Sequence, residues 1–381
     1  MSTPSSPAAS APRLGYLDAL RGVAILMVVL VHVGLELRPY GLPTVAPVRI
    51  VTEYGQMGVQ LFFVVSAFSL CVAHERRSAD PHRLRTFFIQ RFFRIAPLYY
   101  VGILAALLLG MVQNADRGEA RLVPAVFTVP GVLCNLFFIH GFVVRAYAVV
   151  RGGWSMGTEM AFYLCFPPAF RLVAWIGRRG LRPLALAWVG CFAATLAFYS
   201  WLTDGFLIAV LNSTSLYFNL ANQLPVFMAG LVAYFVRREG WWRPTRPVAL
   251  AGFAVLTAGA MALEQSSLPY AFVLLPSVSG LAFVLLLEVF AQWPALSAGW
   301  LQQLGRLSFS IYLFHSAVVY LVTRHLFASP VWNAWAVSRQ ILIFALTVGI
   351  TAFVAAVTER WIERPGIALG RRLAGSGGKV P

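Results

Sequence analysis

Long apolar segments separated by short polar connections make up most of this 381-residue chain. A membrane-spanning helix needs about 20 predominantly apolar residues. Ten segments meet that length: 16–37, 55–75, 96–114, 156–176, 183–202, 219–237, 247–264, 270–289, 307–327 and 338–358. The pattern therefore predicts an all-α, polytopic membrane bundle of about ten transmembrane helices.

An eleventh apolar segment, 123–143, is interrupted by helix-breaking residues. It contains Pro124, Pro130, Gly131, Asn135 and His140 and is a poor continuous helix. Irregular backbone survives at membrane depth only where it is buried in protein or lines a cavity. We therefore expect 123–143 to be a re-entrant or outward-facing element.

Composition supports the membrane assignment. The chain is 59% hydrophobic and 12% charged, whereas soluble domains average about 25% charged residues. The connections are too short for a separate soluble domain. The four cysteines lie in apolar segments without CxxC spacing, which argues against a metal site and a disulfide framework.

The net charge of +16 comes almost entirely from arginine. A basic excess can indicate nucleic-acid binding, but cytoplasmic loops of membrane proteins also collect arginine. With ten spans and a cytoplasmic N-terminus, the clusters within 76–94, 178–182, 237–246 and 360–372 all fall inside, whereas the later outside loops carry no Lys or Arg. The distribution predicts cytoplasmic termini and no nucleic-acid partner.

Three regions follow from these patterns. Residues 1–14 are expected to form a disordered cytoplasmic tail, because they are rich in Ser, Pro and Ala. The apolar segment after them is longer than the core of a signal peptide, so no cleavage is expected. Residues 15–365 form the membrane domain, which ends at a helix stop at Pro365. Residues 366–381 are expected to be a flexible basic cytoplasmic tail.

The first predicted helix carries three ionisable residues, Asp18, Arg21 and His32. Arg21 and His32 are 11 residues apart, which is about three helical turns or roughly 16 Å, so both face the same way. Asp18 can pair with Arg21 at i, i+3. Arg21 could be a snorkelling anchor and His32 a buried hydrogen-bonding histidine, yet ionisable groups inside a membrane are functional candidates.

The motif WSMGTEMAFY, 154–163, begins another span. Ser155, Glu159 and Tyr163 follow one helical face. Glu159 enters the membrane at a depth comparable to that of His32. A carboxylate and a histidine at one depth could act as a base and its orienting partner, or form a structural contact between two helices.

The motif RLRTFFIQRFFRIAP, 83–97, lies on the predicted cytoplasmic side. Arg83, Arg91 and Arg94 fall within one sector of about 80° on the helical wheel. They could contact anionic lipid headgroups. They could equally bind a phosphorylated ligand, since arginine chelates phosphate, and Arg21 lies at the same depth.

Polar residues also share a face in GRLSFSIYLFHS, 305–316. Ser308, Tyr312 and His315 recur at i, i+4, i+7. They could form the polar wall of an internal cavity or hydrogen-bond a neighbouring helix. Asn219, Asn222 and Gln223 form a smaller polar face, for which packing is the favoured role.

These motifs, in this order, resemble the acyltransferase family 3 integral membrane acyltransferases. The resemblance covers about 20–365 and rests on six elements: Arg21 and His32 in the first helix, GVQLFFVVSAF at 58–68, the RxxRIxPxY element from Arg91 to Tyr99, the motif at 154–163, GRLSFSIYLFH at 305–315, and Glu363 with Pro365. Two positions depart from the family pattern: Ala67 replaces a glycine and Phe309 replaces a tyrosine.

The resemblance implies transfer of an acyl group, commonly acetyl, from cytoplasmic acyl-CoA to a hydroxyl. Family acceptors include surface polysaccharides, lipopolysaccharide and small molecules such as macrolides. On this interpretation His32 is the general base, Glu159 orients it, and Trp154 stacks on a sugar. The remaining expected roles are acyl-CoA binding by Arg21, Arg91 and Arg94, lining of the acceptor cavity by Ser155, Tyr163, Ser308, Tyr312 and His315, and structural support by Asp18 and Glu363.

We therefore expect a multi-pass enzyme of the cell (inner or plasma) membrane that O-acetylates a cell-envelope polysaccharide or lipid-linked glycan, with acyl-CoA as the donor substrate and no bound metal or cofactor. One alternative is O-acylation of a small molecule or a lipid. Another is a transporter that uses Arg21, His32 and Glu159 as a proton or anion path. The ordered motifs favour acyl transfer.

Overall fold

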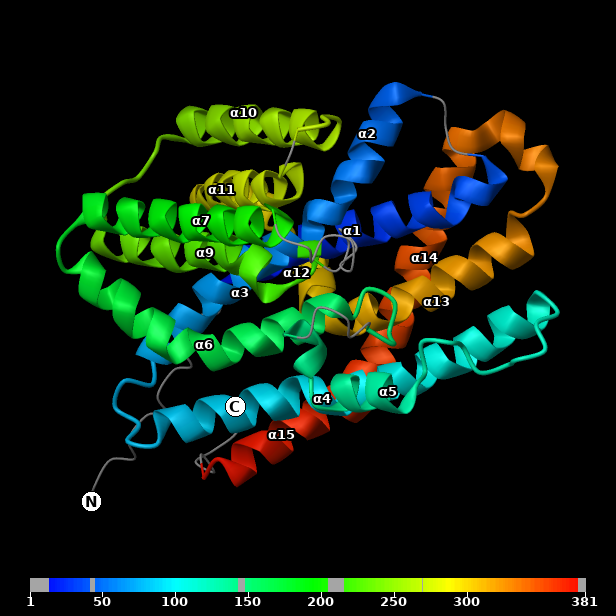
Figure 1. Cartoon of the computed structure of the whole chain (residues 1–381), viewed down its shortest axis with the longest axis horizontal. Coiled ribbons are helices and arrows are strands. Elements are labelled where there is room, and N and C mark those ends of the chain that lie inside the picture. Colours follow the sequence, from blue (N-terminus) through cyan, green and yellow to red (C-terminus); the bar gives the residue numbers. More distant parts are fainter. Residues whose placement is uncertain (1–13, 42–44, 143–147, 205–215, 269, 376–381) are drawn as a thin grey trace, which may run out of the picture.

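The computed structural model describes residues 14–41, 45–142, 148–204, 216–268 and 270–375 (Figure 1). Every regular element within these ranges is a helix, which confirms the predicted all-α class. The elements are α1 Gly15–Leu37, η1 Arg38–Tyr40, α2 Ala46–Tyr54, η2 Gly55–Met57, α3 Gly58–Glu75, α4 Arg83–Asp116, α5 Val129–Leu136, η3 Ile139–Gly141, α6 Trp154–Gly177, α7 Leu181–Asp204, α9 Leu220–Glu239, α10 Arg246–Glu264, α11 Ala271–Gln292, η4 Pro294–Leu296, α12 Gly299–Arg306, α13 Ser308–Leu326, η5 Pro330–Trp335, α14 Ala336–Thr358, the π-helical turn η6 Glu359–Glu363, and α15 Arg364–Leu373.

The number of spans agrees with the prediction of about ten. Within the described ranges, nine helices are long and apolar enough to cross a membrane, and a tenth span results if α12 and α13, which meet at 79°, are counted as one. Exposed tryptophans mark both ends of these helices, as expected at membrane interfaces. Trp175, Trp242 and Trp361 lie near the arginine clusters, and Trp201 and Trp335 lie at the opposite helix ends.

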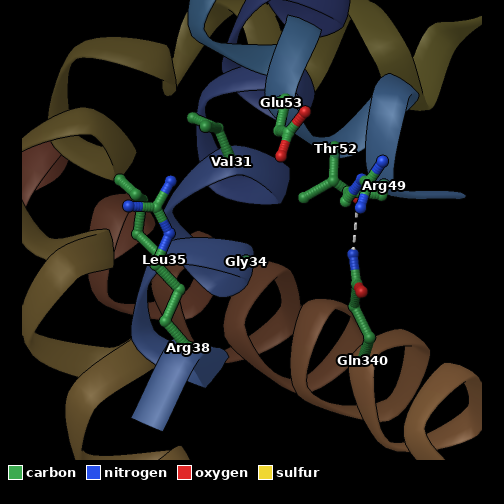
Figure 2. Close-up of a pocket in the computed structure, with 8 residues that line it drawn as sticks. All are labelled: Val31, Gly34, Leu35, Arg38, Arg49, Thr52, Glu53 and Gln340. Carbon is green, nitrogen blue, oxygen red and sulfur yellow. Dashed lines mark hydrogen bonds between the residues drawn. The ribbon is translucent and has the colours of Figure 1, made fainter. Parts of the chain in front are cut away.

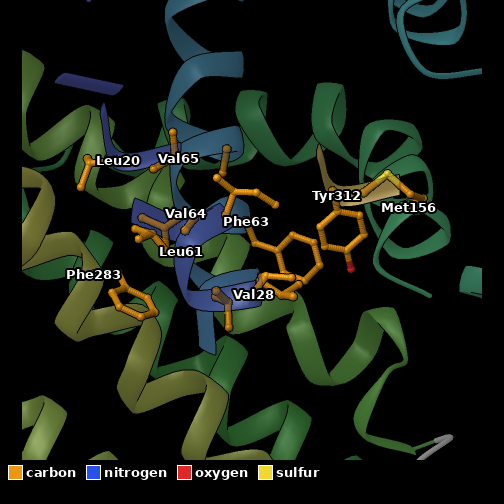
Figure 3. Close-up of a cluster of buried hydrophobic side chains, with 14 of the residues drawn as sticks. Leu20, Val28, Leu61, Phe63, Val64, Val65, Met156, Phe283 and Tyr312 are labelled. Carbon is orange, nitrogen blue, oxygen red and sulfur yellow. The ribbon is translucent and has the colours of Figure 1, made fainter. Parts of the chain in front are cut away.

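The core of the bundle is built on α1 and α3. Figure 3 shows Leu20 and Val28 of α1 close to Leu61 and Val64 of α3, and all four side chains are buried. In contrast, only 11% of the most apolar window of α7, and of α10, is buried inside the protein. These two helices therefore present their apolar side chains to lipid.

Close helix contacts at glycine bring α12 against the start of α1. A Cβ on Gly305 would lie 1.7 Å from the Asp18 carbonyl oxygen, and one on Gly22 would lie 2.2 Å from that of Leu301. Only glycine permits backbones to approach this closely. The contact sets the position of Arg21, which lies on α1 between Asp18 and Gly22.

The interrupted segment 123–143 does not span the bundle. Its helical parts are α5, which has 8 residues, and the single turn η3. The Thr128 side chain caps α5 by accepting the Gly131 N–H. The expectation that 123–143 is not a continuous membrane helix is confirmed.

The C-terminal region differs from its prediction. Pro365 does not stop the helix, because the π-helical turn η6 joins α14 to α15 and the wider turn accommodates a residue without an N–H. Gly366 and Gly370 are buried against Phe93 of α4, so α15 packs along α4. The prediction of a flexible tail is wrong for 366–373. The rest of that tail from 376, and residues 1–13 of the N-terminal tail, lie outside the described residues.

Candidate active site

A cavity with about 730 Å³ of empty space, part of it open to solvent, lies among α1, α3, α4, α6 and α13. We call it the main cavity. It brings together predicted site residues from four separate motifs: Arg21, Arg91, Arg94, Ser155, Glu159, Tyr163, Ser308 and Tyr312.

Arg21 is held in place from two sides. Its guanidinium donates to Asp18 Oδ1 at 2.9 Å and to Ser69 Oγ at 2.7 Å. The predicted pairing of Asp18 with Arg21 is therefore confirmed. Ser69 was not predicted as a site residue, although it follows directly after the recognised motif at 58–68.

Arg91 and Arg94 enter the same cavity from α4. The Arg91 guanidinium lies 5.6 Å from the centroid of the Tyr163 ring and 5.9 Å from that of Phe87, which are cation–π distances. Arg94 is exposed. Ser308, the first residue of α13, also lines the cavity, so the positive end of that helix dipole faces it. The cavity is electrostatically suited to an anion.

Glu159 is the acidic residue that lines the main cavity. Its Oε1 accepts hydrogen bonds from Ser66 Oγ and from the Tyr163 hydroxyl, both at 2.6 Å. The expected contact with His32 is not among the hydrogen bonds or ion pairs of the described residues. Glu159 instead lies within electrostatic range of Arg21 and Arg91, because α6 turns its side chain toward the arginines.

A hydrogen-bonded group that includes Ser155 and Tyr312 lines the main cavity. Ser155 Oγ donates to the Tyr312 hydroxyl at 2.7 Å, and that hydroxyl donates to the Gly152 carbonyl oxygen at 2.7 Å. Figure 3 shows the Tyr312 ring beside Met156 of α6. Tyr312 thus belongs both to the wall of the main cavity and to the surroundings of His315.

His32 and His315 meet behind Tyr312. Their rings form an edge-to-face pair with centroids 4.6 Å apart, and the His315 ring is 5.7 Å from the Tyr312 ring. His32 Nδ1 is 2.8 Å from the Val28 carbonyl oxygen, and His315 Nδ1 is 2.7 Å from that of Tyr312. A carbonyl oxygen accepts only, so each Nδ1 carries the proton and each Nε2 keeps its lone pair. His32 does not itself line the main cavity.

Two predicted residues have mainly packing contacts. Trp154 does not line the main cavity, and its indole is stacked on Phe218 with centroids 4.4 Å apart, so one face is already covered. Glu363 is buried in η6, where it accepts from Ser310 Oγ at 3.3 Å and faces Arg94. Asn222 and Gln223 are buried and donate to the Tyr217 carbonyl oxygen, in line with their expected packing role.

A polar network that motif analysis missed supports the residues leading into α6. Asn135 Oδ1 accepts from the Tyr99 hydroxyl at 2.8 Å and from the Val149 N–H at 3.2 Å. The His140 ring lies 3.2 Å from the carbonyl oxygens of both Cys134 and Gly153. Burial lowers the pKa of His140 below its ordinary value. The polar residues of 123–143 were the available signal, since they have no reason to occur in a lipid-facing helix.

Comparison with known proteins agrees with this geometry. A family model described as an acyltransferase domain matches residues 14–359, and the chain belongs to that family, acyltransferase family 3. The chain is 28% identical to "Acyltransferase MdmB" of Streptomyces mycarofaciens, over 81% of this chain and 79% of the relative. It is 26% identical to "Exopolysaccharide production protein ExoZ" of Rhizobium meliloti, over 83% and 91%. No solved structure matches the chain. The protein is a membrane-bound O-acyltransferase.

Proposed function

We propose that the chain transfers an acyl group, most simply acetyl, from acyl-CoA to a hydroxyl of a cell-envelope polysaccharide or lipid-linked glycan. The observation that carries the proposal is the main cavity itself, in which three arginines converge from two helices and whose wall includes Tyr312, a ring neighbour of His315. The similarity to ExoZ, which is named as an exopolysaccharide production protein, supports a polysaccharide as the acceptor.

The donor enters from the arginine-rich end. Acyl-CoA carries several phosphate charges, and guanidinium groups bind phosphate through paired hydrogen bonds. Arg91 and Arg94 take these phosphates, and Arg21, held by Asp18 and Ser69, completes the cationic wall. By the positive-inside rule this end faces the cytoplasm of a plasma membrane, where acyl-CoA is available.

The acyl end of the donor then passes Tyr312 toward His32. His32 Nε2 removes the proton from the acceptor hydroxyl while the hydroxyl oxygen attacks the thioester carbonyl carbon. The C–S bond breaks, the thiolate of CoA leaves, and the proton held by His32 passes to that sulfur. The Nδ1–H bond to Val28 keeps Nε2 in the basic form at the start of each cycle.

Glu159 acts in the arginine-lined part of the main cavity, where the donor phosphates bind. Its carboxylate fixes Ser66 and Tyr163, and it lies among guanidinium groups that would otherwise repel one another. This arrangement gives Glu159 a role in binding the donor correctly, in addition to the catalytic role expected from its motif.

Labelled acetyl-CoA tests the proposal. Membranes containing the wild type are incubated with [¹⁴C]acetyl-CoA and an envelope glycan fraction, and the glycan is counted. We expect His32→Ala to lose about 10²-fold or more of the transfer, the usual contribution of a general base, with the protein still inserted. His325→Ala, which changes an exposed histidine at the end of α13, is the matched control and should transfer normally. Full transfer by His32→Ala would disprove its assignment.

A further inference from the structure

A second cavity lies at the end of α1 opposite Arg21, between α1, α2 and α14. It has about 330 Å³ of empty space, and we call it the minor cavity (Figure 2). Its lining residues are Val31, Gly34, Leu35, Arg38, Arg49, Thr52, Glu53 and Gln340. None of them lines the main cavity.

Hydrogen bonds fix the walls of the minor cavity. Gln340 Nε2 donates to Thr52 Oγ1 at 2.7 Å, and both residues are buried, so α14 is tied to α2 across the cavity. Thr52 Oγ1 in turn donates to the Val48 carbonyl oxygen at 2.7 Å. Val31 and Leu35 of α1 supply an apolar wall. This combination of an apolar surface with a few fixed polar groups is typical of ligand sites.

Two arginines, Arg38 and Arg49, line the minor cavity. Figure 2 shows the Arg38 side chain on one side of the α1 ribbon and the Arg49 side chain on the other, beside Thr52. Within the part of the chain that the structure describes, no hydrogen bond or ion pair engages either guanidinium. By comparison, Arg151 at the same end of the bundle is paired with Glu36 at 2.9 Å. The single acidic side chain of the minor cavity, Glu53, already accepts from Gln265 at 3.3 Å.

The position of these arginines also calls for a function. Arginine is disfavoured in short outside loops of membrane proteins, and the later loops at this end, 265–268 and 328–337, carry none. Arg121 and Arg151 also lie at this end, but Arg38 and Arg49 are the two that line the minor cavity. Val31, the neighbour of His32 in the chain, lines the minor cavity. Arg38 lies six residues after His32, about 9 Å farther along the helix axis at 1.5 Å per residue.

We infer that the minor cavity is an acceptor subsite for an anionic saccharide, in which Arg38 and Arg49 bind a carboxylate or phosphate of the glycan. The inference rests on the proposed function, since it names the class of acceptor that this function uses. A sugar anchored there places its next ring along α1 toward His32. Because Arg38 and Arg49 require an anionic group, neutral glycans are not the preferred acceptors.

Direct binding tests the inference without any acyl donor. The full chain is placed in phosphatidylcholine nanodiscs and titrated calorimetrically with trigalacturonic acid and with its uncharged methyl ester. We expect the acid to bind and the ester to bind at least about tenfold more weakly, since a charge-assisted hydrogen bond contributes about that factor. The double variant Arg38→Gln/Arg49→Gln should bind the acid about tenfold or more weakly and the ester unchanged.

Two controls keep the test decisive. Arg121→Gln removes the same charge from an exposed residue at the same end of the bundle and should bind like the wild type. His32→Ala should also bind the acid normally, so loss of transfer and loss of binding can be told apart. Equal affinity for acid and ester, or no effect of the double variant, overturns the subsite. So does displacement of the acid by phosphatidylglycerol in mixed nanodiscs, which would make this a lipid headgroup site.

Discussion

His32 and His315, which are 283 positions apart in the chain, meet edge to face with ring centroids 4.6 Å apart. Each ring is fixed by an Nδ1–H bond to a carbonyl oxygen of its own helix. His315 is fully buried, whereas His32 is partly exposed. The bond to Val28 and the packing against His315 therefore both contribute to the orientation of His32.

His315→Phe should separate this positioning role from simple packing. The variant keeps an aromatic ring beside His32 but removes both ring nitrogens. We expect kcat to fall about tenfold, less than for His32→Ala, with the KM for acetyl-CoA unchanged, because the donor phosphates bind elsewhere. Thermal unfolding in detergent serves as the folding control. An increase in KM with constant kcat would contradict the positioning role.

Arg91→Gln and Arg94→Gln should weaken donor binding. Each removes a guanidinium from the wall of the main cavity. We expect the KM for acetyl-CoA to rise about tenfold per substitution, in line with about 1.5–3 kcal/mol for a charged hydrogen bond, and the effect to shrink at high salt. Kinetics with acetyl-CoA and with a short acetyl thioester that lacks phosphates provide the measurement.

The matched control for these variants is Arg85→Gln. Arg85 is exposed on α4, does not line the main cavity, and contacts only the Leu373 carbonyl oxygen at 3.3 Å among the hydrogen bonds described. We expect its KM to remain that of the wild type. If the phosphate-free thioester suffers the same loss as acetyl-CoA, the arginines do not act through phosphate.

Apolar length and arginine distribution were enough to predict the fold class, because a bilayer requires long apolar helices whatever their tertiary partners. The convergence of Arg21, Arg91 and Arg94 was also predicted, since their depth places all three at the cytoplasmic end of the bundle. The hydrogen-bond partners of Glu159, which are Ser66 and Tyr163, were not predicted. Depth gives a position along the membrane normal but not the direction in which a helix turns its side chains.

The same limit explains the other differences. Trp154 was expected to meet a sugar, but stacking on Phe218 depends on a contact between distant segments that no local pattern encodes. Pro365 was expected to end a helix, and local propensity does predict that. The π-helical turn before it and the packing of Gly370 on Phe93 outweigh that propensity, because burial of α15 on α4 stabilises the continued helix.

His140 should make the protein less stable in mild acid. Burial lowers its pKa in the folded protein below the ordinary value of 6.5. At pH 7.5 the residue is neutral in both states. As the pH falls below about 6.5, the unfolded chain binds a proton that the folded protein does not, so the free energy of unfolding decreases until the folded pKa is reached.

Thermal unfolding in detergent at pH 7.5 and at pH 5.5 measures this effect. We expect a decrease in stability approaching about 1.4 kcal/mol per pH unit at most for this one group, and a smaller decrease in His140→Gln. The exposed residue His325 gives the control variant His325→Gln, whose pH dependence should equal that of the wild type. An unchanged pH dependence in His140→Gln would show that His140 titrates alike in both states.

Gly305→Ala should disrupt the contact of α12 with α1, since its added Cβ would lie 1.7 Å from the Asp18 carbonyl oxygen. Backbone atoms cannot rotate away as a side chain can, so the helices must separate. We expect a loss of about 1–3 kcal/mol in stability, as for an overpacked core, and a reduced transfer rate because Arg21 shifts with α1.

Gly349→Ala is the matched control, since nothing lies within 4 Å of its added Cβ. Differential scanning fluorimetry in detergent and the acetyl-transfer assay provide the two measurements. Equal stability of the two variants would mean that α12 does not determine the position of α1.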